Sequence, residues 1–422
     1  VQLRERLPPA QSGAASTLAV IFSLGCGASV GQYGPLVYLG ALVGQLTNRL
    51  HLGIRDIRSI TIACGVAAAI STAFNAPIAA LIFTHEVILR HYSLRMFAAV
   101  TVASACGYVV ANVIFHYPPL FLIEFDKPLH ATEFLLFALE GIFCGFIAVI
   151  FMRLLSWSMR LSKSLRIPAA CKPMLAGFLV SLVALQVPEV LGIGQASVSG
   201  HYTAEGLLLI LVCKLLATVI CLGFGFAGGV MSPSLLIGLM FGALFALLVP
   251  EYLLEDYSGL AVYAICGMVA VMSPVIGAPM TALLLVFEFP RNYEITIAAM
   301  VAIVFANLVS NGWYGRSFFD VQLLERGVDL SQGRLKAYLM HHSVSEYATQ
   351  ALPRLSPSAR LSELREKMKV YETGSAVVID DDGIYLGQVF QHQISDIGDD
   401  SLLSSLKYDR QVEFKQNTSI WE

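Results

Sequence analysis

Apolar segments separated by short polar breaks fill the first three quarters of the chain, and glycine and proline interrupt many of them. Most are shorter than the roughly 20 residues that a simple membrane-spanning helix needs. Short, broken apolar segments in matching halves of a chain are typical of transporters whose helices stop at mid-membrane. The segments lie near 14–30, 35–48, 59–72, 77–89, 96–115, 133–157, 173–187, 205–222, 233–249, 260–273, 279–290 and 295–311.

The last quarter of the chain has a different pattern. Residues 361–370 form an amphipathic helical pattern, and 375–380 and 384–390 alternate like two strands around an Asp-Asp-Gly turn. We therefore expect an all-α polytopic membrane domain over 1–335, a small α/β module over 340–398, and an incomplete tail over 399–422.

Composition supports a membrane protein and excludes several other classes. Hydrophobic residues make up 56% of the chain and charged residues 14%, well below the roughly 25% of soluble domains. A net charge of -3 gives no indication of nucleic-acid binding. The cysteines and histidines lack the spacing of a metal site, and no nucleophile–base pair or phosphate loop predicts an enzyme.

Two motifs occur twice, in the same order, and predict an internal repeat. Pro35 is followed by glycine five and nine residues later, and so is Pro233. Cys-Gly then precedes an Asn-Ala-Pro or Gly-Ala-Pro turn by the same spacing in both halves, which we place at about 14–115 and 205–311. Pro77 follows Pro35 by 42 residues, and Pro279 follows Pro233 by 46.

Loop charges predict that the two repeats are inverted. The loop after the first motif carries Arg49, Arg55 and Arg58, whereas the equivalent second loop carries Glu251, Glu255 and Asp256. Because positively charged loops stay cytoplasmic, equivalent loops should lie on opposite sides of the membrane. The contrast between the almost uncharged residues 14–311 and the more charged residues 316–422 predicts a membrane body with a cytoplasmic tail.

The glycine-rich stretches 25–35 and 223–233 each open a helix with proline in its first turn. Helix N-termini leave N–H groups unpaired and carry partial positive charge. Two such ends that meet at mid-membrane would bind an anion weakly enough to release it. The alternative is that these glycines only permit close helix packing.

These stretches resemble the CLC chloride-channel family. Gly31-Gln-Tyr-Gly-Pro35 is similar to its Gly-x-Glu-Gly-Pro motif, and Gly229-Val-Met-Ser-Pro233 is similar to its Gly-x-Phe-x-Pro motif. The resemblance implies chloride transport, a homodimer in the lipid bilayer, no cofactor, and a first anion motif upstream of Val1. It implies an anion site at Gly31, Gln32, Tyr33, Gly34, Gly229, Val230, Met231 and Phe319.

The chain departs from the family at the positions that carry protons. Tyr33 stands where the family has its gating glutamate, and Val87 stands at the inner proton-relay position. A tyrosine with a pKa near 10 stays neutral at pH 7, and valine cannot relay protons. We therefore expect passive anion transport. An exchanger with an atypical proton path, a non-conducting regulatory homologue in which Tyr33 only packs, and a fluoride-specific relative remain alternatives.

Three charged residues lie within apolar segments, and the sequence is compatible with either a functional or a structural role for each: Glu86, Glu288 and Lys214. The tail resembles the first half of a CBS pair. Because CBS modules normally pair, we expect nucleotide binding by this single module to be unlikely.

Overall fold

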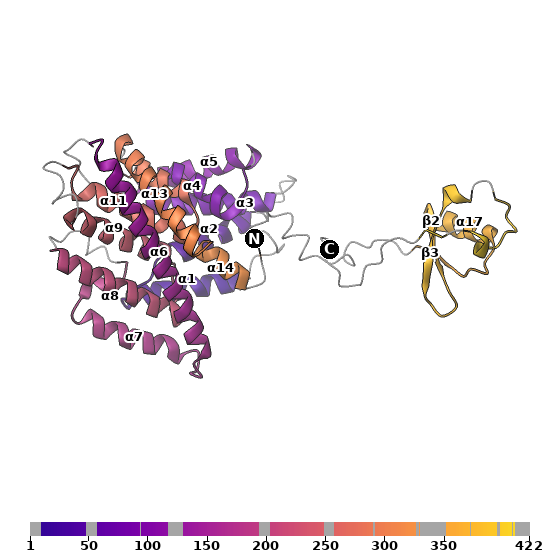
Figure 1. Ribbon diagram of the computed structural model, residues 1–422, viewed down its shortest axis with the longest axis horizontal. Helices are drawn as coiled ribbons and strands as arrows, with labels where there is room; N and C mark the ends of the chain where they lie inside the picture. Colours follow the sequence, from indigo (N-terminus) through magenta and orange to yellow (C-terminus); the bar gives the residue numbers. More distant parts are fainter. Residues whose placement is uncertain are drawn as a thin grey trace. The chain divides into compact units, whose positions relative to one another are not determined.

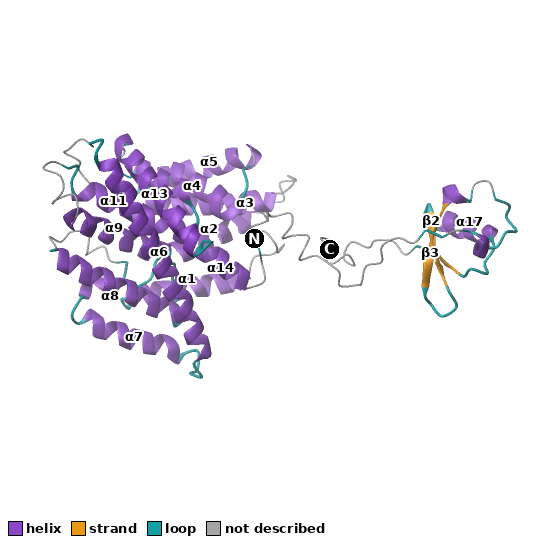
Figure 2. Cartoon of the chain, in the orientation of Figure 1, coloured by secondary structure: helices purple, strands orange, loops and turns teal. Residues whose placement is uncertain are grey.

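The computed structural model describes two separate units, Val1–Asp329 and Leu330–Glu422 (Figure 1). Their described residues are 10–47, 57–92, 94–116, 130–193, 203–248, 257–289, 292–325, 329, 352–371, 373–394, 397–406 and 408–409. Within these residues the first unit is helical, and the second combines short strands with helices (Figure 2).

The helices of the first unit follow the broken apolar segments of the sequence. They are α1 Ala10–Gly25, α2 Tyr33–Thr47, α3 Ile57–Phe74, α4 Pro77–Phe83, the π-helical η2 Thr84–Leu89, α5 Leu94–Tyr108, the π-helical η3 Val109–Ile114, α6 Glu133–Ser164, α7 Cys171–Ala184, the 3-10 turn η4 Pro188–Val190, α8 Ala204–Gly223, α9 Met231–Leu248, α11 Leu260–Ile276, α12 Pro279–Glu288, α13 Tyr293–Trp313 and α14 Phe318–Glu325.

Both long and short helices build this unit. Within the described residues, five helical stretches are long and apolar enough to cross a bilayer: Met96–Ile114, Glu133–Ser164, Ala204–Gly223, Met231–Leu248 and Tyr293–Glu325. Other apolar helices, such as α4 and α12, are too short to do so. The unit is thus a polytopic membrane domain with discontinuous helices, as the pattern predicts.

The repeated glycines explain why the two halves pack alike. A Cβ added to Gly40 on α2 would lie 2.3 Å from the carbonyl oxygen of Gly65 on α3. In the second half, a Cβ on Gly238 of α9 would lie 2.3 Å from the carbonyl oxygen of Gly267 on α11. Real Cβ atoms do not approach that closely, so both crossings require glycine. The sequence repeat is therefore a repeat of helix contacts.

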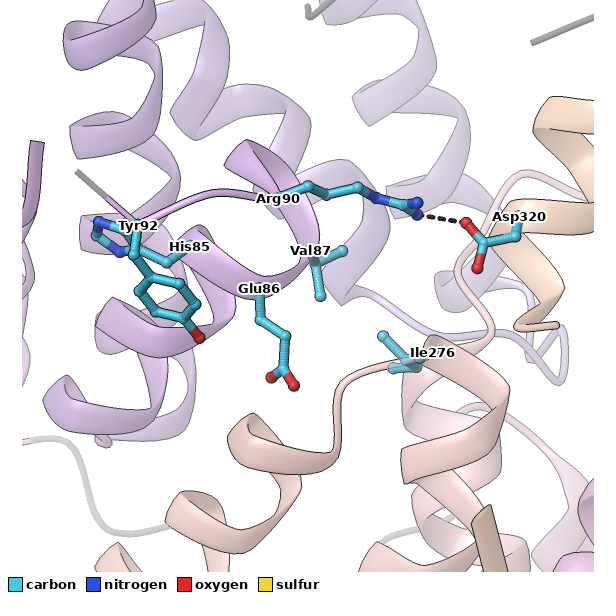
Figure 3. Close-up of a pocket in the computed structure, with 8 residues that line it drawn as sticks. His85, Glu86, Val87, Arg90, Tyr92, Ile276 and Asp320 are labelled. Atoms are coloured by element: carbon cyan, nitrogen blue, oxygen red, sulfur yellow. Dashed lines mark ion pairs between the residues drawn. The ribbon is translucent and has the colours of Figure 1, made fainter. Parts of the chain in front are cut away.

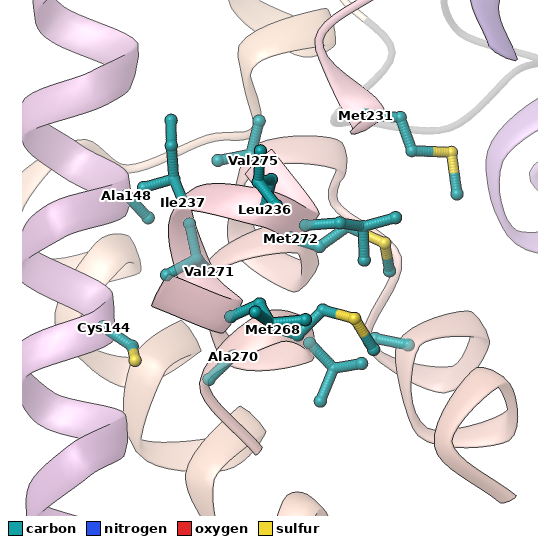
Figure 4. Close-up of a cluster of buried hydrophobic side chains, with 14 of the residues drawn as sticks. Cys144, Ala148, Met231, Leu236, Ile237, Met268, Ala270, Val271, Met272 and Val275 are labelled. Carbon is teal, nitrogen blue, oxygen red and sulfur yellow. The ribbon is translucent and has the colours of Figure 1, made fainter. Parts of the chain in front are cut away.

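The centre of the unit is a mainly apolar core formed by α9 and α11 against α6. Ile237 on α9, Val271 and Val275 on α11, and Cys144 and Ala148 on α6 are each fully buried, and Figure 4 shows these side chains converging. Helix α11 is buried along almost its whole length. A helix that is apolar all round belongs inside a bundle, so α11 forms the axis of the second half.

Two carboxylates tie the halves together reciprocally. Glu86, in η2 after α4, accepts hydrogen bonds from the N–H groups of Met280 and Thr281 at the start of α12, at 3.0 and 2.8 Å. Glu288, at the end of α12, accepts from the N–H groups of Ile78 and Ala79 at the start of α4, both at 2.8 Å. Each carboxylate caps the other half's short helix, where unpaired N–H groups attract negative charge.

The second unit is a small α/β module. Its strands β1 Arg354–Leu355, β2 Ser375–Ile379 and β3 Tyr385–Phe390 form a sheet in the order β1-β2-β3, with β1 parallel and β3 antiparallel to β2. Helix α17 (Leu361–Val370) contributes Leu361 and Leu364 to its core.

Residues beyond the expected boundary at 398 also belong to this module. Leu403 is fully buried in its core, and Gln388 on β3 exchanges two backbone hydrogen bonds with Asp409. The packed structure therefore extends at least to residue 409, into the segment that the sequence pattern assigned to an incomplete tail. The resemblance of the module to a CBS domain stays a prediction.

Candidate functional site

The two glycine-rich stretches meet. Gly31 and Gly229 exchange two backbone hydrogen bonds: the N–H of Gly31 donates to the carbonyl of Gly229 at 2.9 Å, and the N–H of Gly229 donates to the carbonyl of Gly31 at 2.7 Å. This antiparallel bridge joins segments almost 200 residues apart. Helices α2 and α9 begin two residues after their respective glycines, so their N-termini lie at one junction.

The junction depends on glycine. A Cβ on Gly31 would lie 2.7 Å from the carbonyl oxygen of Gly229, and a Cβ on Gly229 would lie 3.0 Å from the amide nitrogen of Gly34. Helices α2 and α9 begin at Tyr33 and Met231, so Pro35 and Pro233 each stand in the first turn, as expected. Proline is tolerated throughout a first turn because those N–H groups have no intrahelical partner.

Tyr33 is buried at the start of α2, with 3% of its surface exposed. Its ring stacks on Phe74, the last residue of α3, with centroids 4.0 Å apart and an interplanar angle of 29°. Phe74 in turn stacks on Phe289, with centroids 6.3 Å apart. Tyr33, which the resemblance places at the gate position, is therefore held by an aromatic stack from both halves of the chain.

The other expected residues at the junction divide into two groups. Val230 and Met231 are buried beside Gly229. Gln32 instead lines a separate, mainly apolar cavity of about 560 Å³, together with Pro35 and Leu36. The structure thus brings together Gly31, Tyr33, Gly34, Gly229, Val230 and Met231, and it places the Gln32 side chain at a different cavity.

Ser232 is a junction residue that the sequence analysis did not single out. Its hydroxyl is buried and makes no hydrogen bond to any described residue. It lies 2.9 Å from the Cβ position of Gly31. A buried hydroxyl without a hydrogen-bond partner is uncommon. The only sign of it in the sequence is a polar residue inside the otherwise apolar stretch between Gly229 and Pro233.

A second polar region lies where η2 approaches α11 and α14 (Figure 3). It is a cavity of about 360 Å³ that Val87 lines together with His85, Glu86, Arg90, Tyr92, Ile276, Gly277 and Asp320. Phe319 precedes Asp320 on α14 and packs against the main core. The expected relay position, Val87, thus lines this cavity, whereas neither Gly31 nor Gly229 is among its lining residues.

Two buried acids on α6 were also missed. Glu133 accepts hydrogen bonds from the hydroxyls of Ser258 and Tyr263, at 2.7 and 3.0 Å. Glu140, about two turns further on, is fully buried beside Gly242 and Gly267, and neither of its oxygens has a hydrogen-bond partner among the described residues. An acid inside an apolar segment was the signal that could have found Glu140.

The three charged residues within apolar segments, Lys214, Glu86 and Glu288, have hydrogen-bond partners that are consistent with structural roles. Lys214 on α8 is fully buried and donates to the carbonyls of Val190 and Gly192, both at 2.8 Å. Glu86 and Glu288 cap helices, as described above. Among the described residues, no group of three or more histidine, cysteine, aspartate or glutamate side chains could hold a metal ion.

Comparisons with known proteins agree with one another. The family model "Voltage gated chloride channel" matches residues 2–311. The "H(+)/Cl(-) exchange transporter ClcA" of Vibrio cholerae is 30% identical over 320 residues, which cover 72% of this chain and 67% of that protein. The "Voltage-gated ClC-type chloride channel ClcB" of Escherichia coli is 26% identical over 308 residues, which cover 72% of this chain and 73% of that protein.

A solved structure shows the same fold. The crystal structure of a slow cyanobacterial Cl-/H+ antiporter matches with a TM-score of 0.68 and 24% sequence identity, and the match covers 77% of this chain and 78% of that one. The inverted helical repeats expected from motif spacing and loop charge are the architecture of such a protein.

Proposed function

The chain belongs to the voltage gated chloride channel family, and from this premise we propose that it moves chloride or a similar small anion across the membrane, past the Gly31–Gly229 junction. The observation that carries the proposal is the meeting of two helix N-termini at that bridge. Each N-terminus carries roughly half a positive charge and unpaired N–H groups. Together they attract an anion without the tight hold of a lysine.

Glycine substitutions test this proposal directly. Gly31→Ala places a Cβ within 3 Å of the Gly229 carbonyl and should separate the two stretches. We expect chloride efflux from proteoliposomes to fall by at least about tenfold. Gly25→Ala is the matched control, because a Cβ there meets no atom within 4 Å although Gly25 lies in the same glycine-rich stretch. Wild-type efflux in Gly31→Ala would argue against a pathway at the junction.

We further propose that transport is not coupled to protons. Tyr33 occupies the gate position and Val87 the inner relay position, and neither exchanges protons near pH 7. Glu86, next to Val87, is already engaged by three hydrogen bonds from α12, two from N–H groups and one from the Thr281 hydroxyl at 2.7 Å. The pathway thus has no carboxyl group at either family position.

Proton-coupled exchange is the second candidate, and the relatives favour it. The Vibrio cholerae protein is named an H(+)/Cl(-) exchange transporter, and the cyanobacterial structure is that of an antiporter. In this chain an atypical proton path would have to use another group near the cavity, such as His85, Glu86 or Tyr92.

Proton uptake by vesicles under an imposed chloride gradient separates the two candidates. Uncoupled transport predicts chloride movement without uphill proton movement, whereas exchange predicts protons in a fixed ratio to chloride. A protein that moves neither ion would support the third reading, a non-conducting regulatory homologue. Tyr33→Glu should add pH-dependent chloride flux without fixed-ratio exchange. Full exchange in that single variant would show that Val87 is no barrier to protons.

We also propose the assembly and orientation that the family resemblance implies: a homodimer in the lipid bilayer with one pathway per subunit and a cytoplasmic tail. Exposed apolar side chains on α4 and α12, such as Ile78 and Met280, suit burial against lipid or a second subunit. Mass measurement in mild detergent tests the dimer, and an active protein found solely as a monomer would contradict it.

A further inference from the structure

The 360 Å³ cavity at η2 is built from both halves of the membrane unit. His85, Glu86, Val87 and Arg90 come from the first half, Ile276 and Gly277 from the end of α11, and Asp320 from α14. Its volume exceeds that of several water molecules, at about 30 Å³ each, so a partly hydrated anion fits. The stretch that follows Arg90 in the sequence also carries Arg95, and basic stretches between membrane helices stay on the cytoplasmic side, which is the side proposed for the tail.

Arg90 stands out in this cavity for its backbone. It follows the π-helical segment η2 and has a φ of 53°, in the left-handed region. That region is uncommon for residues other than glycine, and π-helical segments are frequent at functional sites. The surrounding contacts must hold the residue there, and the ion pair with Asp320 is such a contact.

The ion pair leaves Arg90 able to bind another group. Nη2 of Arg90 lies 2.6 Å from Oδ1 of Asp320, and about a quarter of each side chain is exposed. The other oxygen of Asp320 accepts a hydrogen bond from the Ser317 hydroxyl at 2.7 Å, which holds this carboxylate in place. A guanidinium has five N–H donors, and this contact uses one of its two terminal nitrogens. Figure 3 shows Arg90 reaching across the cavity to Asp320.

Glu86, the second acidic residue of the cavity, does not neutralise the positive charge of Arg90. The carboxylate of Glu86 faces the N-terminus of α12 and accepts its N–H groups, so its charge is largely offset there. Asp320 thus neutralises Arg90 only in part. An anion entering the cavity meets a cation whose attraction is weakened by a fixed carboxylate.

We propose that this cavity is a docking site for the transported anion, in which Arg90 binds the anion and Asp320 keeps that binding weak. The inference rests on the proposed anion transport. A site on a conduction path must bind well enough to admit the ion and weakly enough to release it. An arginine paired with an aspartate that is itself held by Ser317 meets both requirements.

Chloride flux in proteoliposomes, with chloride varied on the tail side, tests the assignment. Proteolysis of the tail reports the orientation of the protein. Arg90→Gln should raise the tail-side KM about four- to tenfold, the effect of removing one charge about 5 Å from an anion in a solvated cavity. The maximal rate should stay within about twofold. Asp320→Asn should lower the same KM.

Arg316→Gln is the matched control. Arg316 also pairs with an aspartate, Asp329, at 2.9 Å and with similar exposure, but it does not line the cavity. We expect its tail-side KM to equal that of the wild type. An equal KM shift in Arg316→Gln, or a lower maximal rate without a KM shift in Arg90→Gln, would reduce the Arg90–Asp320 pair to a structural contact.

Bromide provides a readout that does not depend on transport. In crystals of the full chain soaked in sodium bromide, anomalous scattering should show a peak beside Arg90 that disappears in Arg90→Gln. Absence of the peak in the wild type overturns the docking site. Absence of wild-type chloride flux would refute the proposed function separately, with the bromide peak still deciding whether the cavity binds anions.

Discussion

The reciprocal caps of α4 and α12 allow a quantitative test of whether Glu86 and Glu288 are structural. Glu86→Gln keeps the shape of the side chain but replaces one acceptor oxygen by an NH2 group that faces the N–H groups of α12. It removes at least one charge-assisted hydrogen bond, at about 1.5–3 kcal/mol, and the charge–dipole attraction, at about 0.3–1 kcal/mol. We expect a loss of about 2–4 kcal/mol.

The two caps should respond alike because they are equivalent by the internal repeat. Glu288→Gln faces two backbone N–H groups, both at 2.8 Å, and should cost a similar free energy of unfolding. Both caps hold the same pair of helices, so the double variant should lose less than the sum of the single losses. Thermal unfolding in detergent should show each single variant melting about 4–15 °C lower.

Glu205→Gln is the control for charge at a helix start. Glu205 is exposed in the first turn of α8, and its loss should cost less than about 1 kcal/mol. A structural role for Glu86 is ruled out if Glu86→Gln has the melting temperature of the wild type while its ion transport changes. The equivalence of the two caps is ruled out if only one of them matters for stability.

Three further predictions concern a helix crossing, a buried lysine and the tail module. Gly238→Ala forces a Cβ against the Gly267 carbonyl and should lower the melting temperature by separating α9 from α11. Gly312→Ala is the control, because a Cβ there meets no atom within 4 Å, and equal melting temperatures of the two variants would contradict the close crossing. Lys214→Met should cost about 1–3 kcal/mol, because it leaves the buried Val190 carbonyl and the partly buried Gly192 carbonyl without their donor. Unfolding in detergent measures this loss, and a change near zero would mean that water replaces the ammonium. The isolated tail module, measured by calorimetry, should not bind ATP or AMP at micromolar concentrations, and tight binding by a monomeric tail would show the prediction to be wrong.

The internal repeat could be predicted because its physical causes are local. Close crossings such as Gly40 on Gly65 need glycine at both partners, and helices that begin at mid-membrane need proline or glycine at their starts. These requirements leave the same residues at the same spacings in both halves. The matched spacing around Pro35 and Pro233 therefore predicts a symmetric junction.

The partners of the charged groups could not be predicted, because they are distant in the chain. Glu86 meets Thr281, 195 residues away, and Arg90 meets Asp320. Apolar periodicity reports which face of a helix is buried, but not which helix covers it. Gln32 shows the same limit within a motif, since it lines the apolar cavity of about 560 Å³ whereas its neighbour Tyr33 is buried against Phe74.

The Gly31–Gly229 bridge has a consequence for how the proposed site can be studied and how it can change. Both groups that form it, the N–H and the carbonyl, belong to the main chain, and every residue except proline carries both. Alanine scanning of the neighbouring side chains would therefore leave the chemistry of the site intact, and replacement of single amides by esters is the perturbation that reaches it. Replacing Tyr33 would thus remove its stack on Phe74 without taking away a main-chain group of the bridge.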